Sequence, residues 1–147
     1  MPEAAALNLF EALVEQAPAA LIFADREGAI RVWNAGAETV FGFSKAEVMG
    51  ASLDVIIPER LRDAHWRGFR TAIETGREKY AGKVLTTRAV HKNGSKLYVD
   101  LSFALVRDDA GFVVGSLAIA RDCTDRYALD KALKARVAEL ERGAGNP

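Results

Sequence analysis

The stretch that decides the fold is TTRAVHKNGSKLYVDLSFALVRDDAGFVVGSLAIARD, residues 86–122. Asn93-Gly94 separates two runs in which apolar and polar residues alternate, and this arrangement is the strongest short-range signal for a β-hairpin. A second turn at 108–111 leads into another apolar run. We therefore predict three consecutive strands in the last third of the chain, within 79–91, 96–107 and 112–122.

The first half of the chain alternates between helical and strand patterns. Apolar residues recur at helical spacing near the N-terminus, a hairpin of two short runs follows, and the region after it is helical. The predicted segments are a helix in 7–16, strands in 19–25 and 29–34, short helices in 35–42 and 44–50, and a long helix in 56–76. Five antiparallel strands with helices gathered on one face indicate an α+β domain.

The chain ends in a further helical pattern, from Asp125 to Arg142. Its apolar stripe consists of Leu129, Leu133, Val137 and Leu140. A helix of this length does not hold alone in water, so it packs either on its own domain or on a second copy. We expect a flanking helix in 1–17, a central domain in 18–124, and a C-terminal helix with a frayed end in 125–147.

Composition narrows the class of protein. Lys and Arg equal Asp and Glu in number, which argues against a nucleic-acid binder. The sequence has no nucleophile motif, phosphate loop or Cys/His metal spacing, so we do not expect an enzyme. Cys123 is the single cysteine, no apolar run is long enough for a membrane span, and the start lacks a basic signal region. We therefore expect a cytoplasmic protein that does not enter a membrane.

Two long segments resemble the halves of a PAS domain. They are PAALIFADREGAIRVWNAGAETVFGFSKAEVMG (18–50) and HKNGSKLYVDLSFALVRDDAGFVVGSLAIARDCTDR (91–126). The motifs Asp-x-x-Gly, Trp-Asn-x-x-Ala-Glu, Lys-Asn-Gly and Arg-Asp-x-Thr follow one another in the family's order. The resemblance implies a five-stranded antiparallel sheet with helices over one face, enclosing a pocket. It also implies a sensor of small ligands, redox state, light or gases that signals through terminal helices and dimerisation.

His65 is the most informative candidate for a pocket ligand. It shares an apolar helix face with Leu61, Phe69 and Ile73, which is equally the pattern of a packed core histidine. The resemblance extends to the haem-binding PAS oxygen sensors, whose proximal histidine falls at this place in the long helix. It implies that His65 holds the iron of haem b, because neutral imidazole is a usual haem ligand. His91, beside the hairpin turn, is expected to be exposed.

The rest of the implied haem site departs from those sensors. Twenty residues after the histidine they place an Arg, and here that position is Leu85. The distal positions correspond to Tyr80, Leu101 and Phe103, and Lys79 lies near the expected propionate contact. The implied haem site therefore comprises His65, Phe69, Ile73, Lys79, Tyr80, Leu85, Leu101 and Phe103. With no Arg, oxygen is expected to bind weakly and carbon monoxide well.

Other functions remain open from the sequence. A pocket for a small metabolite and a filled core that serves only dimerisation or partner docking are both compatible with the same residues. The helical segment 35–75 lacks a cysteine, so a flavin photoadduct is not expected. We expect a homodimer through the stripe Leu7, Phe10, Leu13 and Val14. The downstream signalling partner has no signature in the sequence.

Overall fold

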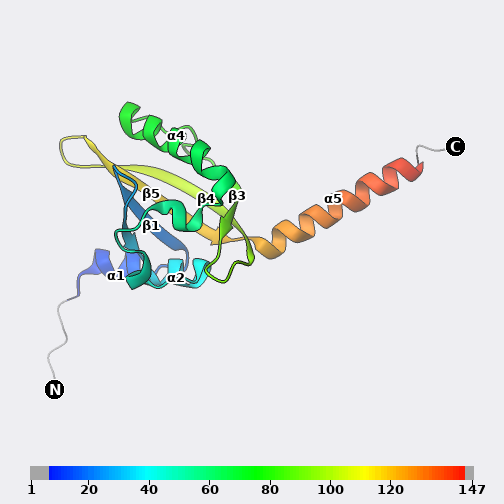
Figure 1. The fold of residues 1–147 in the computed structure, drawn as a ribbon, viewed down its shortest axis with the longest axis horizontal. Coiled ribbons are helices and arrows are strands. Elements are labelled where there is room, and N and C mark those ends of the chain that lie inside the picture. The colour runs from blue at the N-terminus through cyan, green and yellow to red at the C-terminus, as the bar shows by residue number, and fades with distance from the viewer. Residues whose placement is uncertain (1–6, 145–147) are drawn as a thin grey trace, which may run out of the picture.

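The computed structural model describes residues 7–144, and its centre is a five-stranded antiparallel sheet (Figure 1). The strands are β1 (Ala20–Asp25), β2 (Ile30–Trp33), β3 (Leu85–Val90), β4 (Lys96–Arg107) and β5 (Val113–Asp122). Their order across the sheet is β2-β1-β5-β4-β3, so the two hairpins lie on either side of β5. The predicted α+β class and the hairpin at Asn93-Gly94 are confirmed.

Helices separate the two hairpins and flank the sheet at both chain ends. They are α1 (Leu9–Gln16), α2 (Ala35–Phe41), α3 (Lys45–Val48), the 3-10 helix η1 (Leu53–Ile56), α4 (Glu59–Thr75) and α5 (Thr124–Ala144). Figure 1 shows α4 at one end of the sheet and α1 and α2 at the other. Within residues 7–144, no helix is long and apolar enough to cross a membrane.

Local sequence signals set where the middle helices start and stop. The Ser44 hydroxyl accepts from the backbone N–H of Glu47, and the Glu47 carboxylate accepts from the N–H of Ser44, which together form a capping box at the start of α3. Gly76 ends α4 in the left-handed conformation with φ of 67°. Both helix ends can be recognised in the sequence because they depend on residues only three or four positions apart.

Alternation along the strands divides the sheet into an inner and an outer face. Leu97 and Val99 of β4 are buried on the inner face, against residues from α2, α3 and η1. Further along the same face, Leu101, Phe103 and Leu105 are only half-buried. Burial therefore decreases along β4, from the end beneath the short helices toward the later part of the strand.

Three differences from the predicted segments have physical reasons. Residues 79–84 form a loop instead of the start of β3, and Gly82 in it takes a positive φ of 71° that a strand does not allow. Residues 53–56 form the separate helix η1, because Pro58 is the N-cap of α4. Helix α5 reaches Ala144, and the remainder of the predicted frayed end lies outside the described residues.

The terminal helices expose their apolar side chains. Helix α1 buries none of its residues, and Phe10 is 79% exposed. Helix α5 extends away from the rest of the molecule (Figure 1) and exposes Leu129, Leu133, Val137 and Leu140 by more than half. Of the two readings of the α5 stripe, packing on its own domain is therefore wrong within this single chain.

Candidate functional site: the His65 face of helix α4

His65 lies near the middle of α4 and is half-buried. Its Nδ1 atom is buried and has no hydrogen-bond partner among residues 7–144. Buried polar atoms in folded proteins nearly always have a partner, so an unpartnered imidazole nitrogen requires an explanation. The Nδ1 atom therefore lacks the protein hydrogen bond that a packed core histidine usually makes.

Burial also fixes the charge of this imidazole. Removal from water lowers the pKa of His65, and the nearby negative charge of Asp54 opposes this shift without cancelling it. The ring is consequently neutral at neutral pH, where it has a lone pair available for a metal ion or a hydrogen-bond donor. Within residues 7–144 no group of three or more His, Cys, Asp or Glu side chains gathers around a metal position, so a metal at this place would need most of its ligands from elsewhere.

Aromatic side chains surround His65 on its own helix. The Trp66 ring meets it edge-on at 4.7 Å between centroids, and the Phe69 ring lies at 6.0 Å. Trp66 is fixed in turn, because its Nε1–H donates to Asp54 Oδ1 at 2.7 Å and its ring covers Gly28. A Cβ on Gly28 would come within 2.3 Å of the Trp66 ring, so the small residue in the first hairpin is a condition for this arrangement.

The sheet contributes an apolar wall. Leu85 of β3 and Leu101 of β4 are partners in the strand register and share the inner face with Phe103. Tyr80, in the loop before β3, has its ring 6.5 Å from that of Phe103 and is 37% exposed. The ammonium group of Lys79 lies 5.5 Å from the centre of the Tyr80 ring, which is within the range of a cation–π contact.

The predicted site residues thus form two groups. His65 and Phe69 make one on α4, and the loop and sheet residues Tyr80, Phe103, Leu85 and Leu101 make the other. Ile73 is the one buried residue of α4 among those described, and Phe69 and Leu101 both pack against the main core. A neutral imidazole beside aromatic side chains is chemically suited to haem iron or to an apolar ligand with one polar group.

Two features of this region were not predicted from the sequence. Asp54 acts on both His65 and Trp66, but it comes from η1, and no local pattern indicates that a turn brings it to α4. His91 is half-buried instead of exposed. Gly42 leaves room for its ring, because a Cβ there would lie 2.5 Å from His91 Cε1.

The fold and this site define an α+β domain with a half-buried apolar face beneath one long helix. The family described as "PAS fold" matches residues 8–123. The chain therefore belongs to the PAS family, as the resemblance of residues 18–50 and 91–126 predicted. Domains of this family are generally sensory modules.

Similar proteins agree with this assignment. The chain is 30% identical over 124 residues to the "Oxygen sensor protein DosP" of Escherichia coli (strain K12). This match covers 84% of the chain but only 15% of the relative, so most of that protein has no counterpart here. A PAS domain from Colwellia psychrerythraea superimposes with a TM-score of 0.68 at 22% identity, covering 79% of this chain and 95% of that one. An "RNA-binding Light-Oxygen-Voltage Receptor" superimposes with a TM-score of 0.70 at 20% identity, and the match covers 100% of this chain and 43% of that one.

Proposed function

We propose that this PAS domain is a sensor of a gas or of redox state that binds haem b through His65. The observation that carries the proposal is the buried Nδ1 of His65, which has no protein partner on a ring that burial keeps neutral. Bound haem would supply reversible gas binding and one-electron redox chemistry at its iron. His65 would hold the iron, and Lys79 would pair with a propionate.

Two further observations support the proposal. The inner-face residues Leu101 and Phe103 are half-buried where Leu97 and Val99 are fully buried, so the apolar wall is less completely covered on the α4 side. The relative from Escherichia coli is described as an oxygen sensor, and its match covers most of this chain. Apolar walls of this kind would exclude water from a bound haem iron and would leave few polar groups to tune its ligands.

Reconstitution with haem tests the proposal directly. The purified chain is titrated with haem and followed by absorption, and a saturable one-to-one change with a sharp Soret band is expected. The His65→Ala variant should lose this change, whereas the matched His91→Ala variant should keep it, since His91 packs on Gly42 and not on the α4 face. Loss confined to His91→Ala, or no saturable uptake by the wild type, would contradict haem binding through His65.

Leu85 sets the expected ligand preference. A leucine offers no hydrogen-bond donor on the β3 wall, so the haem-loaded chain should prefer carbon monoxide to oxygen. The Leu85→Arg variant adds a charged donor and should raise oxygen affinity relative to carbon monoxide. Gas titrations of both haem-loaded proteins measure this ratio, and an unchanged ratio would remove Leu85 from the proposed site.

A further inference from the structure

The two edges of the sheet differ in whether another segment pairs with their backbone groups. At the β2 edge, Ile30 N–H donates to the carbonyl of Ala51 and its own carbonyl accepts from Gly50 N–H, both at 2.8 Å. The loop 50–52 therefore covers that edge. At the other edge lies β3, and within residues 7–144 no backbone hydrogen bond joins residues 85–90 to any segment other than β4. An uncovered strand edge presents a row of free N–H and C=O groups.

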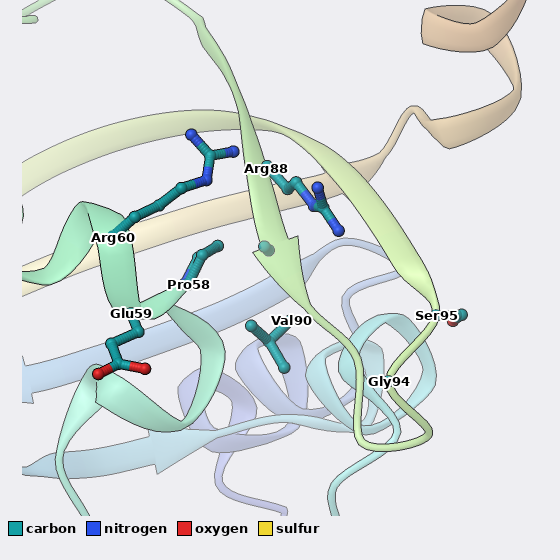
Figure 2. A pocket seen from close by; sticks show the side chains of 8 residues that line it. Pro58, Glu59, Arg60, Arg88, Val90, Gly94 and Ser95 are labelled. Carbon is teal, nitrogen blue, oxygen red and sulfur yellow. The ribbon is translucent and has the colours of Figure 1, made fainter.

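A groove of about 580 Å³ runs beside this free edge. Its walls are residues 58–60 at the start of α4, residues 88–90 of β3, and residues 94–95 of the hairpin turn. Figure 2 shows these three segments around the groove, with the Val90 side chain between them. The groove shares none of its lining with the His65 site, so it is a separate surface on the same helix.

The lining of the groove carries more positive than negative charge. Arg60 and Arg88 come from opposite walls, and in Figure 2 the guanidinium group of Arg88 lies across β3 from that of Arg60. Neither takes part in the ion pairs formed among the described residues. Glu59, the acidic residue in the lining, extends the other way in Figure 2.

We propose that the edge of β3 and this groove bind an extended acidic segment of a partner protein, which pairs with β3 as a sixth strand. Backbone pairing would use the free N–H and C=O groups of β3, a recognised mode of peptide binding. Side chains of an added strand alternate between faces, so neighbouring carboxylates would lie on both faces of the sheet, one toward Arg60 of α4 and the next toward Arg88, which shares a face with its register partner Tyr98. Guanidinium groups bind carboxylates with paired hydrogen bonds that set register as well as affinity.

An extended segment fits this surface better than a free anion. A small anion would use the two guanidinium groups but would leave the row of backbone groups on β3 unsatisfied by anything but water. A segment with only apolar side chains would use the backbone groups but would place no negative charge near Arg60 and Arg88. A strand with acidic side chains uses both features, which is why the charge and the free edge together point to this class of partner.

A synthetic peptide tests the proposal on the intact chain. The probe has about six residues, the usual length of a strand, with Glu at successive central positions, Thr at both ends, and blocked termini. Titrated into the isotopically labelled chain, it should shift the backbone amide signals of residues 85–90 and slow their hydrogen exchange. Its affinity should fall as salt is raised, because ion pairs on an exposed surface are screened.

Three matched controls decide the outcome. Arg60→Gln and Arg88→Gln should each weaken binding about tenfold, whereas Arg67→Gln, on the same helix but outside the groove lining, should leave it unchanged. A peptide with Lys in place of Glu should not bind. An acidic peptide N-methylated at alternate residues keeps its charge but cannot pair as a strand, and it should bind at least tenfold more weakly.

Several results would overturn the proposal. They are no binding of the acidic peptide at millimolar concentration, equal binding of the N-methylated peptide, equal binding of the Lys peptide, or an equal loss in Arg67→Gln. Equal binding of the N-methylated peptide would make the groove a site for anions alone. Since none of these measurements involves haem, the outcome is independent of the function proposed for His65.

Discussion

At the scale of single residues, Asn34 connects three elements through one buried amide. Its Oδ1 accepts from the N–H groups of Leu21 and Ala37 at 2.8 and 2.9 Å. Its Nδ2 donates to the carbonyls of Val14 and Ala19 at 2.8 and 3.1 Å. One side chain thus joins the end of α1, the start of β1 and the start of α2.

Replacement of Asn34 by Ala should be strongly destabilising. The substitution leaves two N–H groups and two carbonyls without their partner in a buried place, and each unsatisfied group costs about 1–3 kcal/mol. We expect a loss of at least about 3 kcal/mol in the free energy of unfolding. Urea denaturation measures it, with Asn8→Ala at the exposed N-cap of α1 as the control, for which about 1 kcal/mol or less is expected. Equal losses for both would contradict the role of Asn34 as a junction.

His65 should make the stability of the haem-free chain depend on pH. Burial lowers its pKa in the folded state, so below about pH 6.5 the unfolded chain binds a proton that the folded chain resists. Stability should therefore fall as the pH drops from about 7 toward 5. The His65→Leu variant cannot take up this proton, and its urea midpoint should fall less over the same range. Parallel curves for the two proteins would mean that His65 is not desolvated.

At the scale of elements, two glycines in helices should respond to alanine in opposite ways. A Cβ on Gly36 of α2 would lie 2.2 Å from the Ala19 carbonyl oxygen, which is itself held by Asn34. A Cβ on Gly68 of α4 meets nothing within 4 Å. We expect Gly36→Ala to destabilise the fold by about 1–3 kcal/mol and Gly68→Ala to stabilise it by about 0.5–1 kcal/mol.

Thermal unfolding of the two glycine variants gives the comparison directly, because the chemical change is the same. The prediction is tested by the sign of the change in stability for each variant. A loss at Gly68 would imply that α4 approaches another part of the molecule more closely than the described contacts indicate. A gain at Gly36 would imply that α2 can move away from Ala19 without breaking the Asn34 junction.

Elements that depend on neighbouring residues were predictable, and those that depend on distant contacts were not. The Asn93-Gly94 hairpin, the Ser44–Glu47 capping box and the Gly76 cap each follow from a few adjacent residues. The loop at 79–84 was mistaken for strand because Tyr80 and Val84 fit an alternating pattern, although Gly82 between them takes a positive φ and the pairing of β3 with β4 begins only at Leu85. In the site, His65 was identified from its helix face, whereas Asp54 and the groove beside β3 arise only when separate segments meet.

At the scale of the whole molecule, the exposed apolar residues of α1 favour a dimer. Leu9, Phe10 and Leu13 are each more than half exposed, and a contiguous apolar surface of this kind usually marks an interface. We expect the intact chain to be dimeric at tens of micromolar, a range set by ordinary interface affinities. Phe10→Glu should shift it toward the monomer, because the substitution places a charge on that surface.

Sedimentation of both proteins checks the dimer. Since Phe10 is exposed in the single chain, its replacement should leave the fold intact, and circular dichroism verifies this. The Leu129→Glu variant separates the contribution of α5. A dimer that dissociates only in Leu129→Glu would mean that α5, and not α1, is the interface.

Among the described residues, helix α5 contacts the sheet through its first turn. The Tyr127 ring stacks on Tyr98 at 3.7 Å, and Arg126 pairs at 2.7 Å with Asp100, whose carboxylate also accepts from Thr86 beside Leu85 of the proposed haem wall. The remainder projects freely, and its 21 residues give an arm about 32 Å long. A tilt of only about 10° at the fastened end would sweep the far end through about 5 Å, roughly one helical turn. Through the contacts of Asp100, a displacement of β3 too small to disturb the core would therefore produce a displacement of several Å at the far end of α5.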